Sequence, residues 1–224
     1  MASGGTAKFL KERGIPALDI TTIVGNPIFG HQVVTLSTAI HGPLLSRDIP
    51  EEAADLERLP IPRIDLLYVN LYLLEQEINK PAATSESVIE MTDVGGPAMV
   101  HSAVKGGRIV VCDEEDIPRV IVWLMNQKPE QERFLTYLRA KAELVVGRYI
   151  LMSGFYHASF LTSLDPEWPV MNKILYDVTN TLEQVVQTLP RNEVLALKWC
   201  CRNCHEEVDI TEEICPHCSL KRPE

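Results

Sequence analysis

The stretch Ile64-Asp65-Leu66-Leu67-Tyr68-Val69-Asn70-Leu71 decides the fold class of this chain. It is a nearly continuous apolar run, which predicts a strand that is buried on both faces. A second apolar run over residues 108–112 (RIVVC) predicts another such strand. Helices are predicted between and after these strands, over residues 84–91, from Asp93 onward and over residues 113–125. Strands that alternate with helices are typical of a layered α/β domain with a mainly parallel sheet.

The sequence on either side of this core also has helical patterns. Residues 7–13 predict a short helix, and residues 50–59 predict an acidic one. The stretch between them is punctuated by glycine and proline and predicts irregular structure. Farther along the chain, two long helices are predicted, over residues 129–160 and over residues 169–189.

The composition is that of a soluble globular protein with a sizeable core: 224 residues, 46% of them hydrophobic and 23% charged. The formal net charge of −10 argues against nucleic acid or an acidic membrane as the main partner. Residues 1–5 lack the apolar segment of a secretory signal, and the most apolar later stretch, residues 144–160, is interrupted by glycine, arginine and histidine. We therefore expect a cytoplasmic protein that does not span a membrane.

Five of the six cysteines lie in the last 25 residues, which favours a metal site in a reducing compartment over a disulfide framework. Two C-x-x-C pairs with ten residues between them can complete a tetrahedral thiolate shell around one structural zinc ion. The expected ligands are Cys201, Cys204, Cys215 and Cys218. Cys200 could replace Cys201, iron could replace zinc, and the cysteines could instead be redox-active or unpaired thiols.

We expect an α/β domain over residues 1–165, a helical linker over residues 166–190 and a zinc ribbon over residues 191–224.

Three polar features interrupt apolar surroundings in the expected α/β domain. Ser3-Gly4-Gly5-Thr6 precedes a helix, where backbone N–H groups and hydroxyls suit a phosphate, although such a segment is more often only a turn. Asn70-Leu71-Tyr72 follows the first strand, where α/β proteins commonly bind ligands, although a tyrosine there is more often packing. Asp93 precedes a helix that contains Gly95-Gly96-Pro97 and ends near Lys105, and the plainer interpretation is an N-cap and a solvated lysine.

Taken in chain order, these segments follow the pattern of one family. The matching segments are residues 3–8, Thr35-Leu36, His41-Gly42, residues 65–72 and residues 93–105. They resemble the IMP cyclohydrolase domain of the bifunctional purine biosynthesis enzyme AICAR transformylase/IMP cyclohydrolase, over about residues 3 to 160. The N-L-Y and D-[IV]-G-G segments are the specific parts. The resemblance implies a methylglyoxal-synthase-like (MGS-like) fold and ring closure of 5-formamidoimidazole-4-carboxamide ribotide to IMP, with loss of water.

The resemblance also implies which residues line the site. Asp93 would orient or deprotonate the amide, Lys105 would stabilise the oxyanion, and Tyr72 would hydrogen-bond the reacting group. The implied ribotide-binding residues are Ser3, Gly4, Gly5, Thr6, Thr35, Asn70, Gly95 and Gly96. No organic cofactor is implied. The implied partner is a purine ribotide, and a homodimer and a protein partner at the zinc ribbon are left open.

Departures from the family pattern favour a second interpretation. Gln32 and Val34 stand where the family carries an arginine and a lysine, and each lost charge-assisted bond would cost about 1.5–3 kcal/mol. The family's first strand and its S-D-K-T-G phosphate loop have no counterpart after Met1, so we expect a truncated chain or a partly dismantled site. No transformylase domain follows, so formyl transfer is not expected. The second interpretation is a catalytically impaired relative that binds a nucleotide or a protein through its zinc ribbon.

Overall fold

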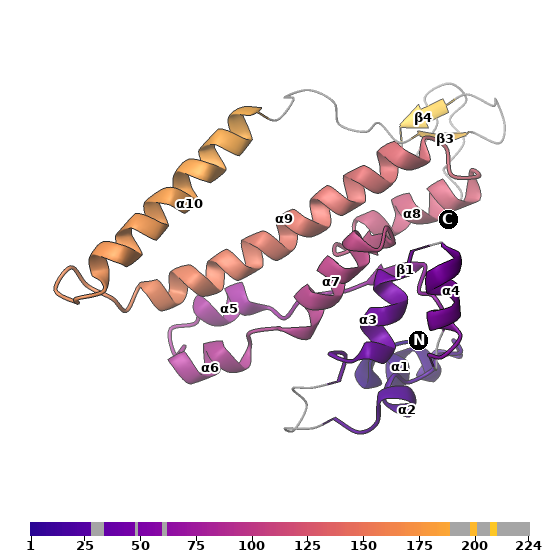
Figure 1. Cartoon of the computed structure of the whole chain (residues 1–224), viewed down its shortest axis with the longest axis horizontal. Helices are drawn as coiled ribbons and strands as arrows, with labels where there is room; N and C mark the ends of the chain where they lie inside the picture. The colour runs from indigo at the N-terminus through magenta and orange to yellow at the C-terminus, as the bar shows by residue number, and fades with distance from the viewer. Residues whose placement is uncertain (28–33, 48, 60–61, 189–197, 201–206, 210–224) are drawn as a thin grey trace. The chain divides into compact units, whose positions relative to one another are not determined.

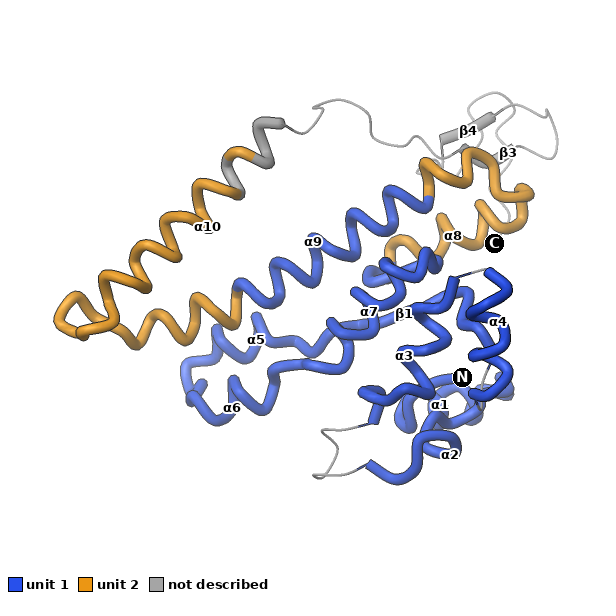
Figure 2. The backbone as a smooth tube through the Cα atoms, viewed as in Figure 1, with its two compact units in different colours: residues 1–114, 135–151 blue, residues 115–134, 152–224 orange. Residues whose placement is uncertain are grey.

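The computed structural model describes residues 1–27, 34–47, 49–59, 62–188, 198–200 and 207–209 (Figure 1). The chain divides into two compact units (Figure 2). Unit 1 comprises residues 1–114 and 135–151, and unit 2 comprises residues 115–134 and 152–224. The long helix α9 (Gln131–Ala158) contributes residues to both. The domain boundaries expected at residues 165 and 190 stay predictions.

Unit 1 contains a small parallel sheet, as the α/β prediction requires. β1 (Leu66–Tyr68) pairs with β2 (Ile109–Val111), and Leu67 lies opposite Val110. The prediction that the first strand is buried on both faces is wrong. Leu66 and Tyr68 are 41% and 42% exposed, whereas Leu67 packs against the core. Successive side chains of a strand point to opposite faces, so β1 buries one face only.

The core of unit 1 lies between the sheet, α3 (Thr38–Leu45), α7 (Gly95–Lys105) and the middle of α9. Its buried side chains are Ile20, Ile40, Leu44, Val69, Val100, Ala103, Val110, Ala142 and Val146. α3 and α7 run side by side in the same direction (Figure 1). Thr35, just before α3, lies against Gly95 at the start of α7, and Leu44, near the end of α3, lies against Gly106 just after α7. Their starts therefore lie at the same end of the unit.

The sequence failed to predict α3. Its Gly42 and Pro43 indicated irregular structure, yet both lie within the helix, and Pro43 is buried. Glycine and proline lower the local preference for a helix, but the packing of Ile40 and Leu44 into the core outweighs that preference here.

Five shorter helices complete the described part of unit 1. They are α1 (Gly4–Glu12), α2 (Thr21–Val24), α4 (Pro50–Leu56), α5 (Leu74–Ile78) and α6 (Ser85–Glu90). The helices predicted over residues 7–13, 50–59 and 84–91 are confirmed, although α1 begins three residues earlier than expected. A capping box fixes the start of α6, since the Thr84 and Ser87 side chains each accept a hydrogen bond from the other residue's backbone N–H.

Unit 2 is mainly helical in its described residues. The predicted helices correspond to α8 (Asp116–Met125), α9 and α10 (Trp168–Thr188). The Trp123 and Phe134 rings, 4.9 Å apart, join α8 to the first turn of α9, and the Trp123 indole donates a hydrogen bond to the Pro129 carbonyl. Strands β3 (Lys198–Cys200) and β4 (Glu207–Asp209) pair antiparallel. Across the described helices of both units, none combines the length and apolar character needed to cross a membrane.

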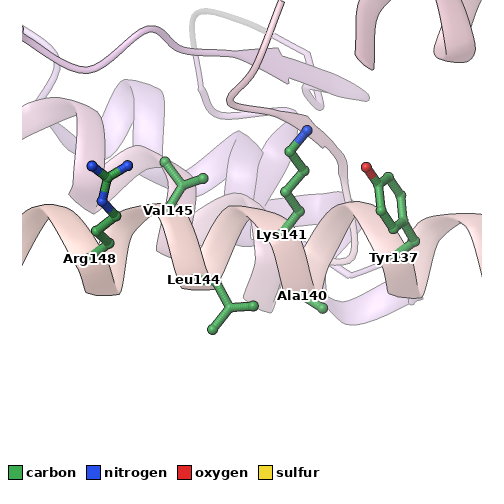
Figure 3. A pocket seen from close by; sticks show the side chains of 6 residues that line it. All are labelled: Tyr137, Ala140, Lys141, Leu144, Val145 and Arg148. Carbon is green, nitrogen blue, oxygen red and sulfur yellow. The ribbon is translucent and has the colours of Figure 1, made fainter. Parts of the chain in front are cut away.

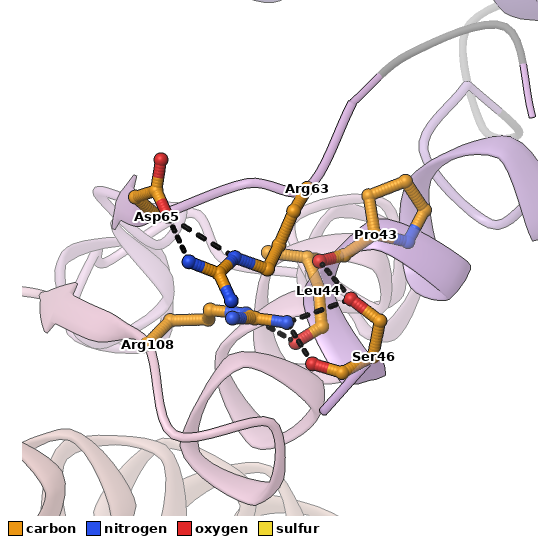
Figure 4. Close-up of polar contacts among 6 residues, drawn as sticks. All are labelled: Pro43, Leu44, Ser46, Arg63, Asp65 and Arg108. Carbon is orange, nitrogen blue, oxygen red and sulfur yellow. Dashed lines mark hydrogen bonds and ion pairs between the residues drawn. The ribbon is translucent and has the colours of Figure 1, made fainter. Parts of the chain in front are cut away.

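A buried arginine ties the end of α3 to the start of β2 (Figure 4). Arg108 is 6% exposed. Its guanidinium donates to the Leu44 carbonyl at 2.9 Å, to the Ser46 hydroxyl at 2.8 Å and to the Ser46 carbonyl. Carbonyl groups at the end of a helix lack partners within the helix, so this cation satisfies them and complements the negative end of the helix dipole. Arg63 lies beside it and pairs with Asp65.

Gly106→Ala is expected to lower the free energy of unfolding by about 1–3 kcal/mol. A methyl group at Gly106 would collide with the Leu44 carbonyl, and backbone atoms cannot rotate away as a side chain can. Urea unfolding followed by circular dichroism measures the effect. The control is Gly147→Ala in α9, where an added methyl meets no atom within 4 Å and should stabilise the helix by about 0.5–1 kcal/mol. Equal effects of the two substitutions would contradict the close approach of α3 and α7.

Candidate functional site

The candidate site is built around Asp93, which precedes α7. One oxygen of its carboxylate accepts a hydrogen bond from the Gly96 backbone N–H at 2.8 Å. The backbone N–H groups of Gly95 and Tyr72 also stabilise this carboxylate. The plainer interpretation of the sequence made Asp93 the N-cap, but Val94 holds that position, and Asp93 satisfies an N–H of the first turn of α7 from one residue earlier. Through the Tyr72 N–H, the carboxylate also contacts the segment that follows β1.

Two glycines make this arrangement sterically possible. A methyl group at Gly95 would lie 2.5 Å from the Thr35 hydroxyl oxygen. A methyl group at Gly96 would collide with the Asp93 carboxylate and lie 2.9 Å from the Leu71 side chain. Glycine lets the start of α7 approach its neighbours closely. The structure thus brings together Thr35, Leu71 and Asp93 from three separate segments.

Burial sets the protonation behaviour of Asp93. The carboxyl group is half-buried, and loss of solvent raises its pKa above the ordinary value, while the N–H groups of Gly96, Tyr72 and Gly95 act in the opposite direction. Desolvation disfavours the charged form of an acid, and here it is the larger effect. A carboxyl group whose pKa is raised by burial is a candidate for general acid–base chemistry.

Tyr149 of α9 is a site residue that the sequence did not predict. Its hydroxyl accepts a hydrogen bond from the Asp93 backbone N–H at 2.7 Å and donates one to the Met91 carbonyl at 3.0 Å. The side chain is buried, and burial raises the pKa of the phenol, with smaller contributions from the charges of Asp93 and Tyr72. Tyr149 lies 56 residues from Asp93 inside a long helical pattern, where nothing in the sequence distinguishes it from a packing residue.

Asn70 and Tyr72, which follow β1, were predicted to line the site, and the structure brings the backbone of Tyr72 to it. Tyr72 contributes its backbone N–H to Asp93, and its phenol is close enough to influence the pKa of Tyr149. Tyr72 is 48% exposed, so its ring stands at the surface of the site and not in the core. Asn70 is also exposed. Whether either side chain binds a ligand stays a prediction.

The structure does not bring Lys105 to Asp93 within one chain. Lys105 is the last residue of α7 and Asp93 precedes the first, so about 15 Å of helix separates them. That is beyond the reach of one lysine side chain. The family resemblance grouped Asp93 with Lys105 but gave no distance between them, although the length of the helix could have been predicted from the sequence. The implied role of Lys105 stays a prediction.

The predicted phosphate-binding turn has a carboxylate beside it. Ser3 is the N-cap of α1, and its hydroxyl donates to the Thr6 hydroxyl at 3.2 Å. A methyl group at Gly4 would lie 3.5 Å from the Asp19 carboxylate. Hydrogen bonds from the backbone and hydroxyl of Thr21 lower the pKa of Asp19, so this neighbour is anionic at neutral pH. An anion already complements this helix start, which makes the turn less receptive to a phosphate.

One of the two departures from the family pattern can be followed in the structure. Val34 packs against the core of unit 1 as a partly buried apolar side chain. It supplies packing where the family resemblance implies a cation. Gln32 lies outside the described residues.

A hollow lies along α9 (Figure 3). It is lined by Tyr137, Ala140, Lys141, Leu144, Val145 and Arg148. The two cations in it are engaged elsewhere, Lys141 with Asp113 at 2.7 Å and Arg148 with Glu75 at 2.6 Å. The side chains of Leu144 and Ala140 do not converge with the others on one point. Since its cations are held in ion pairs and its side chains do not converge, the Asp93 cluster is the better candidate.

Part of the chain matches a known family. Residues 1–98 match the MGS-like domain family. This MGS-like region contains Asp93, Thr35, Tyr72 and the first two glycines of α7, and it ends before Lys105 and Tyr149. The segments that meet at the start of α7 thus lie inside a region with a recognised family pattern.

Curated relatives are similar to the MGS-like region and the residues that follow it. A bifunctional purine biosynthesis protein PurH from Synechocystis is 47% identical over 107 residues, which is 47% of this chain and 21% of that protein. The PurH protein of Persephonella marina is 37% identical over 168 residues, 73% of this chain and 30% of that protein. The chain thus spans less than a third of the length of these two relatives.

A solved structure has a similar fold. The crystal structure of ForH superimposes with a TM-score of 0.52 and 29% sequence identity, and the match covers 70% of this chain and 80% of that one. The match extends beyond the MGS-like region, since 70% of the chain exceeds the 98 residues that the family pattern covers.

Proposed function

We propose that this chain is an IMP cyclohydrolase, which closes 5-formamidoimidazole-4-carboxamide ribotide to IMP with loss of water. The observation that carries the proposal is the half-buried Asp93 carboxyl group at the glycine-lined start of α7, whose pKa is raised by burial. Asp93 lies in the MGS-like region, and the similar curated proteins are named for purine biosynthesis. A carboxyl group of this kind can take up and return a proton during a reaction at neutral pH.

The reaction needs a proton acceptor and a donor to the formyl oxygen. A bond forms between the carboxamide nitrogen and the formyl carbon, and the formyl oxygen leaves as water with one hydrogen from each of the two nitrogens. In the proposed scheme Asp93 takes a proton from the attacking carboxamide nitrogen. The Tyr72 phenol donates a hydrogen bond to the formyl oxygen as negative charge grows there. Asp93 then returns its proton to that oxygen, and the formamide nitrogen gives up its proton as the oxygen departs as water.

A direct assay tests the proposal. The purified chain is mixed with the formylated ribotide, and IMP is followed by absorbance and identified by chromatography. We expect turnover well above the uncatalysed rate, and Asp55→Asn, which changes an exposed carboxylate on α4, should keep it. Lys105→Ala in the same assay tests the role that the resemblance implies for that residue. A wild-type rate equal to the uncatalysed background would contradict the cyclohydrolase proposal.

The packing of Val34 favours a second candidate function, that of a relative that binds the ribotide without converting it. A valine in the core cannot supply the charge that the family pattern implies at that position. Calorimetry with IMP distinguishes the two functions. Binding without turnover would favour the binding protein, and turnover would exclude it.

We further propose that the C-terminal cysteines hold one structural zinc ion. Cys201, Cys204, Cys215 and Cys218 lie outside the described residues. Support comes from β3 and β4, an antiparallel pair that brackets residues 201–206 and hence the first C-x-x-C pair. Paired strands bring the chain on either side of this C-x-x-C pair together, which suits two thiolates that share one ion. A homodimer and a protein partner at this ribbon stay predictions.

Metal analysis of the purified chain is expected to find about one zinc ion per chain. The double variant Cys204→Ser/Cys215→Ser should lose it, because a closed thiolate shell cannot form with one ligand missing from each pair. Cys112→Ser, which changes the cysteine after β2 in unit 1, should keep the metal. Equal zinc content in the double variant and the wild-type chain would exclude this site, and iron in place of zinc would correct the metal.

A further inference from the structure

Tyr149 connects the middle of α9 to the segment between α6 and α7. Its side chain is 7% exposed, and both of its hydrogen bonds go to backbone atoms of this segment, the Met91 carbonyl and the Asp93 N–H. The Thr92 hydroxyl donates to the Val88 carbonyl and fixes the same segment to the end of α6. The backbone on either side of Thr92 is therefore held by a buried phenol.

The two hydrogen bonds constrain Asp93 from its backbone side. Its carboxylate is held by the Gly96 N–H at 2.8 Å, and its own N–H is held by the Tyr149 hydroxyl at 2.7 Å. A hydroxyl that donates once and accepts once can satisfy both backbone groups, whereas a phenylalanine ring of nearly the same shape can satisfy neither. Within Tyr149, it is the hydroxyl and not the ring that bonds α9 to the backbone of Asp93.

We propose that Tyr149 is a positioning residue for Asp93, whose phenol fixes the backbone of residues 91–93 so that the Asp93 carboxyl stays at the start of α7 and shielded from water. The kinetic part of this proposal rests on the proposed cyclohydrolase function, and the structural part does not. A group that is held in place before the reaction loses less freedom when the reaction occurs, which is how positioning raises a rate.

The main test is the titration of Asp93 in the wild-type chain and in Tyr149→Phe. Carboxyl carbons of aspartate are labelled with ¹³C, and the Asp93 resonance is assigned from its absence in Asp93→Asn. Among the described residues, the titratable side chain that bonds to Asp93 is the phenol of Tyr149, whose pKa is raised by burial. Tyrosine ordinarily titrates near pH ~10, above the range of the measurement. The Asp93 midpoint can therefore be followed without a second titration nearby.

The midpoint should fall toward the ordinary aspartate value in Tyr149→Phe, by at least about half a pH unit, because a loosened segment admits water to the carboxyl group. Tyr176→Phe, at an exposed tyrosine of α10, should leave the midpoint unchanged. An unchanged midpoint in a folded Tyr149→Phe variant would overturn the proposal. Hydrogen exchange in the wild-type chain is a second test, since the Asp93 amide should exchange slowly, and fast exchange would also overturn it.

The kinetic arm separates this proposal from the proposed function. If the wild-type chain converts the ribotide, Tyr149→Phe should lower kcat by roughly tenfold and change KM by less than twofold, since the variant alters the position of the acid–base group and not ligand contacts. A kcat equal to that of the wild-type chain would overturn the positioning role. If the wild-type chain is inactive, the cyclohydrolase proposal fails, and the titration and the hydrogen exchange still decide the role of Tyr149.

Discussion

Asp93→Asn is expected to lower kcat for ring closure by at least about a hundredfold and to leave the chain folded. General acid–base catalysis by a positioned side chain contributes roughly 10²- to 10⁴-fold to a rate, and asparagine cannot take up the proton. Its amide oxygen can still accept the Gly96 hydrogen bond, so the start of α7 should keep its geometry. Steady-state kinetics of IMP formation measure the loss. Turnover within a factor of three of the wild-type rate would exclude Asp93 from the proton transfer.

The stability of Asp93→Asn should differ from that of the wild-type chain in a pH-dependent way. The pKa of Asp93 is higher in the folded chain than in the unfolded chain, so the folded chain binds this proton more tightly. That preference stabilises the fold only at acid pH and is lost as pH rises through the folded pKa. Above the folded pKa the ionised carboxylate therefore costs stability, which asparagine avoids. Urea unfolding should find the variant at least as stable as wild type at pH 7, with a smaller advantage at pH 4, and the opposite trend would contradict the raised pKa.

The part of the site that the sequence predicted is the part carried by local chemistry. Asp93 followed by two glycines indicated a polar helix start with close backbone approach, and the structure places Thr35 and Leu71 against those glycines. The helical patterns of α8 and α10 were readable because apolar residues recur at helical spacing along them. These features depend on neighbours in sequence.

The features that the sequence did not predict depend on contacts between distant segments. Tyr149 is an ordinary aromatic residue of α9 until its hydroxyl meets the Asp93 segment. α3 forms despite Gly42 and Pro43 because its apolar side chains are buried against α7. The exposed face of β1 could not be inferred from its apolar run, since burial of the second face depends on what packs over the sheet and not on the strand alone. Lys105 and Asp93 belong to one motif in the sequence, but they lie at opposite ends of α7 in the structure.

Arg108→Met is expected to lower the free energy of unfolding by about 3–5 kcal/mol, the largest stability change that we predict for one substitution. Methionine has a similar length and keeps the apolar packing of the stem, but it cannot donate hydrogen bonds. The Leu44 carbonyl, the Ser46 carbonyl and the Ser46 hydroxyl would lose a charged partner at a buried position. Each buried acceptor left without a partner costs about 1–3 kcal/mol. Since single domains are stable by only about 5–15 kcal/mol, this loss is a large fraction of the total.

The matched control for Arg108→Met is Arg58→Met. Arg58 pairs with Asp55 at 3.1 Å on the exposed surface of the α4 region, where ion pairs contribute about 0–1 kcal/mol. Urea unfolding followed by circular dichroism compares the two variants with the wild-type chain. Both substitutions remove one guanidinium and change the net charge equally, so the difference between them reports burial and hydrogen bonding alone. A loss for Arg108→Met no larger than that for Arg58→Met would mean that the end of α3 finds other partners, and the cation would then not be what joins α3 to β2.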